Sequence, residues 1–395
     1  MTAEVAILNN QGVAIAADSA VTMSFHWGEK KTYYTTDKIF QISKKHPVGV
    51  MVYNQADFMG INWKILINEY SKQLGEKTFD TLEEYMKNFI AFLTEFKFIT
   101  EKKQKEYLEY ICFSTFSIVK EYYDSEISGS QNNGNDLSDQ EKTGILTSAI
   151  NKRNDELEKG TIVFQDFSGK FIKSNRDVIL SVVKEIFDEI DVNEEQNEVL
   201  VRLVMLDAQK LESNGLFRHS GVVMVGFGER EIFPAICSTK IFGRLGLDLV
   251  HEAVDSDSIT DEGQSLIAPF AQTDVINTFL RGIDFELQDR IENLFIDILQ
   301  KIGLEDEPMK EQIEFFIDSI NQMKKKHYTG PILDIVGSLP AVNLAEMAEA
   351  LINITSLRRH VSTDSETVGG PTDVALITKV DGFVWIKKKN NLNLR

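Results

Sequence analysis

The start of the chain constrains the fold most strongly, because short apolar segments alternate there with turns. Residues 3–8 (AEVAIL) and 13–18 (VAIAAD) flank residues 9–12 (NNQG), and Asn and Gly tolerate the positive φ of a tight turn. Residues 38–42 (KIFQI) and 48–53 predict two more strands. We therefore expect the chain to open with an antiparallel sheet.

Helical periodicity dominates the next part of the chain. One expected helix, residues 81–96, begins with the capping-box sequence Thr81-Leu-Glu-Glu84 ahead of apolar residues at helical spacing. The other helices expected in this part cover residues 59–74, 101–127, 142–159 and 175–211.

Strands and helices then return in groups. Residues 221–226 and 231–238 predict a hairpin, and residues 373–388 predict another around Asp381-Gly382. Between them, the expected elements are a strand at 265–270 and helices at 274–283, 285–301, 308–326 and 344–360. Strands that are grouped rather than alternating with helices favour an α+β fold with antiparallel sheets.

Charge and composition exclude several classes of function. Lys and Arg number 42 against 61 Asp and Glu, and a net charge of −19 argues against binding to nucleic acid or anionic lipid. The apolar runs are too short to span a membrane, and the first residues do not form a secretory signal. Cys112 and Cys237 form no CxxC and the six histidines lack metal-ligand spacing, so we expect no metal, no cofactor and a cytoplasmic location. The basic run 387–389 is interpreted as a solvated face.

An aspartate and a lysine interrupt the apolar segments at the front. Asp18 ends the second strand and Lys38 opens the third. Strand alternation places Lys38 on the face of Phe40 and Ile42, where a lysine is costly unless it is paired. Asp18 shares its face with small alanines, which leave room for a long side chain to cross. The simplest interpretation is an Asp18–Lys38 pair beneath the first strand.

An Asp18–Lys38 pair could assist Thr2 as an N-terminal nucleophile. Removal of Met1 would expose a residue that carries both a hydroxyl and a free α-amine, whose pKa lies near ~8. Nucleophile and general base then belong to one residue. Lys38 would keep the amine deprotonated and assist proton loss from the hydroxyl, and Asp18 would hold the lysine charged. Taken singly, the three residues also fit ordinary roles: a Thr that permits Met removal, a strand-end turn former and a lysine that reaches solvent.

The front of the chain resembles a known family. The segments TAEVAILNNQGVAIAADSAVTM, TTDKIFQISKK and VGVMVYNQAD are similar to the N-terminal part of proteasome β subunits and their bacterial HslV-like relatives, which are N-terminal nucleophile (Ntn) hydrolases. The resemblance implies a four-layer αββα sandwich of two antiparallel sheets. It places Thr2 on the nucleophile, Asp18 on the supporting aspartate and Lys38 on the catalytic lysine, with a few extra residues in the 24–37 loop.

A weaker match follows the expected helix at residues 344–360. In the family an Asp and then a Ser–Gly pair close the site near the N-terminal amine. Asp364 and Thr367 have about the right separation, with Thr in place of Ser and Val368 in place of the glycine. Ser365 is a second candidate hydroxyl. The alternative is a Gly-rich turn into the last hairpin.

One further position concerns the oxyanion hole. The family usually has a glycine at the end of the fourth strand, and its backbone N–H stabilises the oxyanion. The corresponding residue here is Tyr53 or, with a shift of one residue, Asn54. A backbone donor does not require glycine, and Asn tolerates unusual φ better than most residues. Either N–H is therefore a candidate, above a more crowded pocket.

The resemblance also implies how the chain is divided. Residues 1–74 and 216–395 form the expected Ntn-hydrolase core, and residues 75–215 form a mainly helical insertion. The functional hypothesis is a threonine-dependent peptidase or amidohydrolase that acts on a peptide or protein substrate. Because family members build closed rings, a homo-oligomer is expected. Two alternatives stay open: a weakly active or inactive proteasome-like scaffold or binding protein, and a peptidase gated by a regulatory partner.

Overall fold

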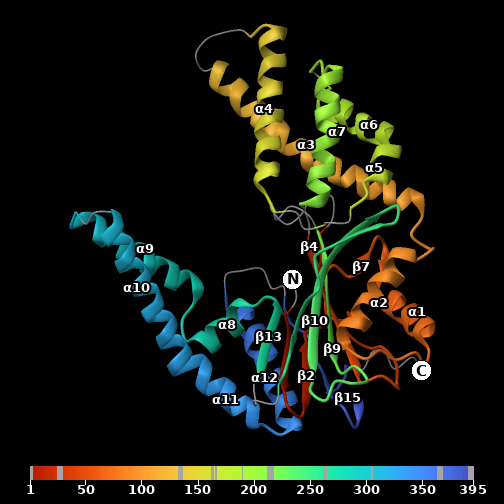
Figure 1. Cartoon of the computed structure of the whole chain (residues 1–395), viewed down its shortest axis with the longest axis vertical. Coiled ribbons are helices and arrows are strands. Elements are labelled where there is room, and N and C mark those ends of the chain that lie inside the picture. Colours follow the sequence, from red (N-terminus) through yellow and green to blue (C-terminus); the bar gives the residue numbers. More distant parts are fainter. Residues whose placement is uncertain are drawn as a thin grey trace.

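The computed structural model describes residues 3–24, 30–131, 137–161, 164, 167–188, 190–210, 218–260, 265–303, 306–362 and 368–389. Thr2 and the segment with Asp364, Ser365 and Thr367 lie outside these residues. Two antiparallel sheets and helices around them make up the described chain (Figure 1). The predicted α+β class with antiparallel sheets is confirmed.

The first sheet combines the two ends of the chain. Its order is β13-β1-β2-β14-β15, and all neighbours are antiparallel. Asn9 lies opposite Gly12, so the predicted first hairpin is present. The strands are β1 (Ala3–Asn9), β2 (Gly12–Ala17), β13 (Leu266–Ala271), β14 (Asp373–Thr378) and β15 (Gly382–Lys387).

The second sheet has the order β11-β10-β9-β6-β5, and β12 also pairs with β10. Its strands are β5 (Ile39–Gln41), β6 (Val48–Asn54), β9 (Ser220–Gly226), β10 (Ala235–Leu245), β11 (Asp248–His251) and β12 (Asp255–Ser258). The four front strands were expected to form one sheet, but β5 and β6 belong to the second sheet. Two small hairpins complete the strands: β3 (Val21–Ser24) with β4 (Lys30–Tyr33), and β7 (Asp57–Phe58) with β8 (Ile61–Asn62).

Alternation along β1 explains how the sheets stack. Ala6 and Leu8 pack between the two sheets, whereas Val5 and Ile7 pack on the opposite face against helices. The helices on that face are α8 (Asp274–Arg281), α11 (Gly330–Ser338) and α12 (Ala341–His360). Helices α1 (Trp63–Leu74) and α2 (Leu82–Glu95) cover the outer face of the second sheet. The layer order is thus helix, sheet, sheet, helix.

Helix α2 belongs to this sandwich by its packing. Thr81 Oγ1 accepts a hydrogen bond from Glu84 N, which confirms the predicted capping box. Tyr85 and Phe89 of α2 are buried in the same core as the second sheet. Although α2 falls inside the expected insertion of residues 75–215, the separate helical core begins only at α3.

That second core, which we call the helical unit, is built from five helices: α3 (Glu101–Gln131), α4 (Asp139–Lys159), α5 (Lys170–Ser174), α6 (Arg176–Ile186) and α7 (Glu194–Gln209). The single helix expected at 175–211 is therefore two helices. Phe242 and Leu245 of β10 are buried in the core of the helical unit, so this long strand joins it to the sandwich (Figure 1).

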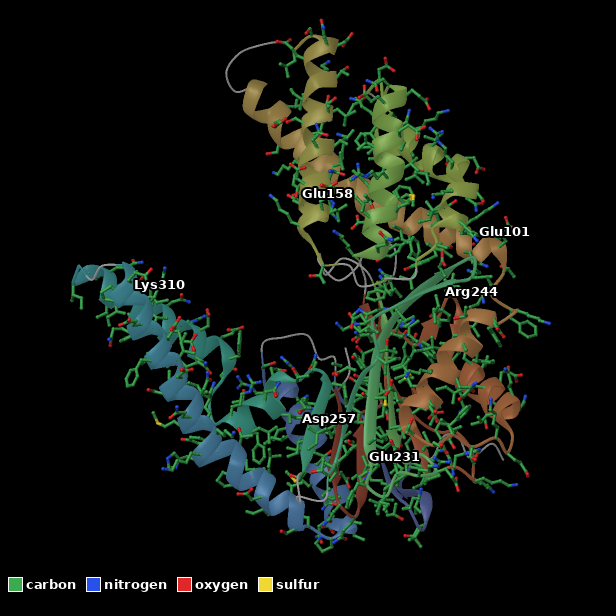
Figure 2. The ribbon with its side chains drawn as sticks, viewed as in Figure 1. Glu101, Glu158, Glu231, Arg244, Asp257 and Lys310 are labelled. Carbon is green, nitrogen blue, oxygen red and sulfur yellow. The ribbon has the colours of Figure 1, made fainter. Side chains whose placement is uncertain are left out.

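Arg244 fixes the junction between the two regions. It lies where β10 meets the helices (Figure 2). Its guanidinium donates hydrogen bonds to the carbonyl oxygens of Leu93, Phe96 and Ile99 at 3.2, 2.8 and 3.0 Å. Leu93 lies in the last turn of α2, and Phe96 and Ile99 lie between α2 and α3, so one buried arginine holds the crossing from sandwich to helical unit.

A helical hairpin forms a second projection, at the left of Figure 1. It consists of α9 (Phe285–Lys301) and α10 (Asp306–Lys324), and a π-helical turn (Lys325–Thr329) leads from α10 into α11. The rings of Phe295 and Phe316 stack at 4.1 Å between the two helices. None of the helices in the described parts of the chain has the length and hydropathy to cross a bilayer.

Candidate active site

The predicted pair of Asp18 and Lys38 is present in the interior. Lys38 Nζ lies 2.6 Å from Asp18 Oδ1, and the two side chains are 5% and 1% exposed. Asp18 directly follows β2, and Lys38 directly precedes β5. The ion pair therefore links the end of a strand in one sheet to the start of a strand in the other.

The reasoning from strand faces that predicted this pair was wrong. Ala14 and Ala16 pack in the core between the first sheet and its helices. Phe40 and Ile42 pack in the core of the second sheet and α1 and α2, two layers away. Asp18 and Lys38 meet because both lie just outside their strands, where alternation no longer fixes the direction of a side chain.

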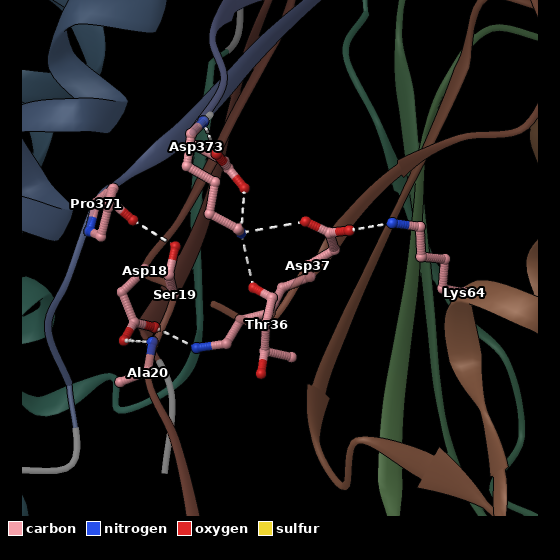
Figure 3. A network of polar contacts seen from close by, with 10 residues as sticks. Asp18, Ser19, Ala20, Thr36, Asp37, Lys64, Pro371 and Asp373 are labelled. Carbon is pink, nitrogen blue, oxygen red and sulfur yellow. Dashed lines mark hydrogen bonds and ion pairs between the residues drawn. The ribbon is translucent and has the colours of Figure 1, made fainter. Parts of the chain in front are cut away.

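Backbone donors surround the carboxylate of Asp18. Oδ1 accepts from Ala3 N at 3.0 Å, and Oδ2 accepts from Ala20 N and Gly369 N, both at 3.0 Å. With Lys38, four N–H donors converge on this one side chain. The start of β1, the end of β2 and the segment before β14 are thereby tied together at one point. Figure 3 shows Asp18 beside Ala20.

Lys38 is held between opposing electrostatic effects. Burial lowers its pKa from the ordinary value of 10.5, while the nearby Asp18 and Glu4 act to raise it. Its own carbonyl oxygen accepts a hydrogen bond from Val52 N at 3.0 Å. The lysine is therefore fixed at both ends, by the second sheet and by Asp18.

A second carboxyl group, Glu4, was not predicted as a site residue. It lies on β1 and is fully buried, and neither of its carboxyl oxygens has a hydrogen-bond partner among the described residues. Burial raises the pKa of Glu4 from 4.5 to about 8, although Lys38 acts in the opposite direction. A signal was available in the sequence, since Glu4 is the one charged residue in the apolar segment AEVAIL.

At the end of β6, the two candidates for the oxyanion donor, Tyr53 and Asn54, differ in backbone conformation. Asn54 has φ of 69°, whereas Tyr53 is a regular strand residue opposite Gly221. The Tyr53 ring covers Gly221 so closely that a Cβ there would lie 1.9 Å from it, and it stacks on Phe270 at 5.7 Å. Asn54 Nδ2 lies 2.7 Å from His219 Nε2.

One depression adjoins the ion pair, and a second lies next to the first. The first is lined by Lys38, Tyr53, Asn54 and Gln55 together with Thr36 and Asp37. The second has a volume of about 390 Å³, lies between the β7–β8 hairpin and α3, and shares Gln55 with the first. Its lining includes Tyr107 and Tyr110 of α3, together with His219 and Phe242. The helical unit thus forms one side of a groove beside the site.

A second buried lysine fixes the loop that carries Lys38. Lys389 Nζ lies 2.6 Å from Asp373 Oδ2 and 3.4 Å from Asp37 Oδ1, and it donates to the Thr36 carbonyl at 2.7 Å (Figure 3). Asp37 also binds Lys64 Nζ at 2.6 Å. The Lys389 side chain is 4% exposed, so the interpretation of residues 387–389 as a solvated face was wrong at this residue.

Four of the predicted site residues cannot be placed. Thr2, Asp364, Ser365 and Thr367 lie outside the described residues and stay predictions. The described neighbours of both segments, Ala3 and Gly369, donate to Asp18. Within the described residues, no group of three or more His, Cys, Asp or Glu side chains is arranged to hold a metal ion.

Comparisons with known proteins give no family assignment. No protein-family model matches the chain, and a search of curated proteins found no match. Among solved structures, a Gly-1 mutant of Anbu from Hyphomicrobium sp. strain MC1 is similar at 9% sequence identity and a TM-score of 0.28, over 98% of this chain and 86% of that one. A similarity this low carries no argument, so the function has to be argued from the site.

Proposed function

We propose that the protein hydrolyses amide bonds with Thr2 as an N-terminal nucleophile after removal of Met1. One observation carries this proposal: the backbone N–H of Ala3 and the ammonium group of Lys38 bind the same oxygen of Asp18. Ala3, the residue that follows Thr2 in the sequence, therefore binds the same carboxylate oxygen as a buried lysine.

The residues then have distinct roles in the reaction. The Thr2 hydroxyl attacks the substrate carbonyl and its proton passes to the α-amine, directly or through a water. The positive charge of Lys38 favours the deprotonated amine, and Asp18 orients Lys38. When the intermediate collapses, the leaving amine takes the proton, and water later hydrolyses the ester on Thr2.

The layer order of the fold supports the same class of enzyme. Helices cover the outer faces of two stacked antiparallel sheets, which is the arrangement implied by the resemblance to Ntn hydrolases. The positive φ of Asn54 supports its N–H, rather than that of Tyr53, as the oxyanion donor. The groove beside Gln55 offers space for a peptide on the side of the helical unit.

The test has two stages. Intact mass measurement first shows whether Met1 is removed, since a retained Met1 turns the α-amine of Thr2 into an amide and excludes the mechanism. Hydrolysis of short fluorogenic peptides is then compared among wild type, Thr2→Ala and Thr2→Ser. We expect no turnover by Thr2→Ala and measurable turnover by Thr2→Ser. Equal rates for wild type and Thr2→Ala would remove Thr2 from the reaction.

The second candidate is a scaffold or binding protein, and one feature of the surface favours it. The α9–α10 hairpin exposes several large apolar side chains, among them Phe285, Leu294, Ile298 and Phe315. Exposed apolar side chains gathered on one projection are typical of contact surfaces. Retention of Met1 together with a defined oligomer in sedimentation would favour this candidate over hydrolysis.

A further inference from the structure

Glu4 occupies a position where a carboxyl group is unexpected. It lies two residues after Thr2 on β1, and successive even-numbered residues of this strand, Ala6 and Leu8, face the second sheet. Its neighbours in the adjoining strands are Phe270 and Ala17, both apolar. A buried polar group without partners is costly, so its presence calls for an explanation.

The two carboxyl groups near Lys38 have opposite surroundings. Asp18 receives three backbone N–H groups and the lysine, whereas Glu4 receives no hydrogen bond from any residue that the structure describes. An ionised carboxylate needs donors in a dry interior, and a neutral carboxyl group needs fewer. Two carboxyl groups whose surroundings differ in this way divide into a fixed charge and a neutral acid.

The groups that act on Glu4 come from three elements. Lys38 precedes β5 and Asp18 follows β2, and both are close enough to act on the charge of Glu4. From β6, the half-buried Tyr53 stacks on Phe270, the cross-strand neighbour of Glu4. Burial, with a smaller effect of Glu4, raises the pKa of Tyr53 to about 12, so the phenol stays neutral at physiological pH. With Glu4 neutral, Asp18 is the carboxylate that balances the charge of Lys38 among the residues that the structure describes.

We propose that Glu4 is a positioning residue that remains protonated during turnover and so leaves the positive field of Lys38 intact at the N-terminal amine. This inference rests on the proposed function. A Glu4 carboxylate would oppose the charge of Lys38, and the α-amine would then hold its proton more strongly. Because only the free amine accepts the proton of Thr2, ionisation of Glu4 would slow the reaction.

The test compares pH profiles of kcat/KM between pH 6 and 10 for wild type, Glu4→Gln and Glu4→Met. Gln imitates the neutral carboxyl group, and Met has similar length without a titratable group should the Gln variant not fold. Near pH 8, where Glu4 ionises in the wild type and raises the pKa of the α-amine, we expect the variants to be severalfold faster than wild type. This difference should disappear by pH 10, where the amine is free in all three proteins. Glu109→Gln, which removes an exposed carboxylate on α3, should keep the wild-type profile.

Two outcomes would overturn the proposal: superimposable pH profiles for wild type and the folded variants, or loss of the variants' activity at every pH. A failure of the proposed function is distinguishable, because then wild type shows no hydrolysis at any pH. In that case urea unfolding across the same pH range decides. Parallel stability curves for wild type and Glu4→Gln would show an ionised Glu4, and curves that diverge above pH 4.5 would show the neutral form.

Discussion

Each of the two regions of this protein contains a buried ion pair, and the two pairs differ in what surrounds them. In the helical unit, Arg153 donates to both oxygens of Asp207 at 2.9 and 3.0 Å, and Thr115 Oγ1 donates to Oδ2 at 2.8 Å. These residues come from α4, α7 and α3. Asp207 is thus completely paired within a helical core, which is an arrangement that specifies packing.

The Lys38–Asp18 pair in the sandwich, to which we assign a catalytic role in the proposed function, has different surroundings. Lys38 is a single ammonium rather than a planar fork, and a buried lysine changes its proton affinity readily. It adjoins the start of β1, lines an open depression and acts electrostatically on a second carboxyl group, Glu4, which has no hydrogen-bond partner in the part of the chain that the structure describes. Burial of an ion pair therefore does not by itself indicate a reaction centre, and the unpaired neighbour is the more informative feature.

The largest expected effect is on the pH dependence of stability, which distinguishes Glu4 from the paired carboxylates. The pKa of Glu4 is raised from 4.5 in the unfolded chain to about 8, so its contribution to stability is complete below pH 4.5 and is lost as pH rises to about 8. A shift of this size corresponds to about 5 kcal/mol in the free energy of unfolding. We expect Glu4→Gln to gain about that much over wild type between pH 4.5 and 8, as measured by urea unfolding. If the free energies of unfolding of wild type and Glu4→Gln differ by the same amount throughout this pH window, the neutral state assigned to Glu4 is wrong.

The next effect concerns Lys38 in the proposed reaction centre. Lys38→Met should lower kcat/KM for peptide hydrolysis by about 10³-fold, within the range found for groups that assist proton transfer. Asp18 keeps three backbone donors in this variant, so the fold should survive. Circular dichroism serves as the control for folding. Activity within a few-fold of wild type would place Lys38 outside the reaction.

Arg153→Met tests the opposite half of the comparison. It leaves the Asp207 charge without its cation in a dry core and should cost about 3 kcal/mol of stability or more, with little change in kcat/KM for the folded protein. The double variant Arg153→Met/Asp207→Leu should recover much of this loss, because no uncompensated charge remains. A large fall in kcat/KM for folded Arg153→Met would show that the helical pair serves the reaction too.

Local features of the fold could be predicted from the sequence, and long-range ones could not. The capping box at Thr81 and the hairpin around Asn9 and Gly12 depend on residues that are neighbours in the chain. The assignment of strands to sheets depends on pairings such as that of β2 with β14, which comes from the far end of the sequence. For the same reason, periodicity identified α2 as a helix but did not show that it packs on the sandwich.

The candidate site was predictable to the extent that it contained charged residues at the ends of apolar segments. Asp18 and Lys38 were found in this way, although strand alternation gave the wrong reason for their contact. Glu4 was missed because the strand pattern of residues 3–8 does not show which face is covered, and packing against the second sheet buries this position. The burial of Lys389 depends on Asp373 and Asp37, and no local pattern brings these together.

The smallest expected effect separates Asn54 from Tyr53. Asn54→Ala puts a Cβ-bearing residue that lacks Asn's tolerance at φ of 69°, and should cost about 1 kcal/mol of stability. Asn54→Gly relieves the strain and should be close to neutral, since glycine adopts this backbone region freely. If the Asn54 N–H stabilises the oxyanion, the Gly variant should also retain kcat, because the backbone donor is preserved while the contact of the side chain with His219 is lost. A Gly variant that folds normally but loses kcat would assign the role to the Asn54 side chain. It would then also explain why asparagine occupies a position whose backbone conformation suits glycine better.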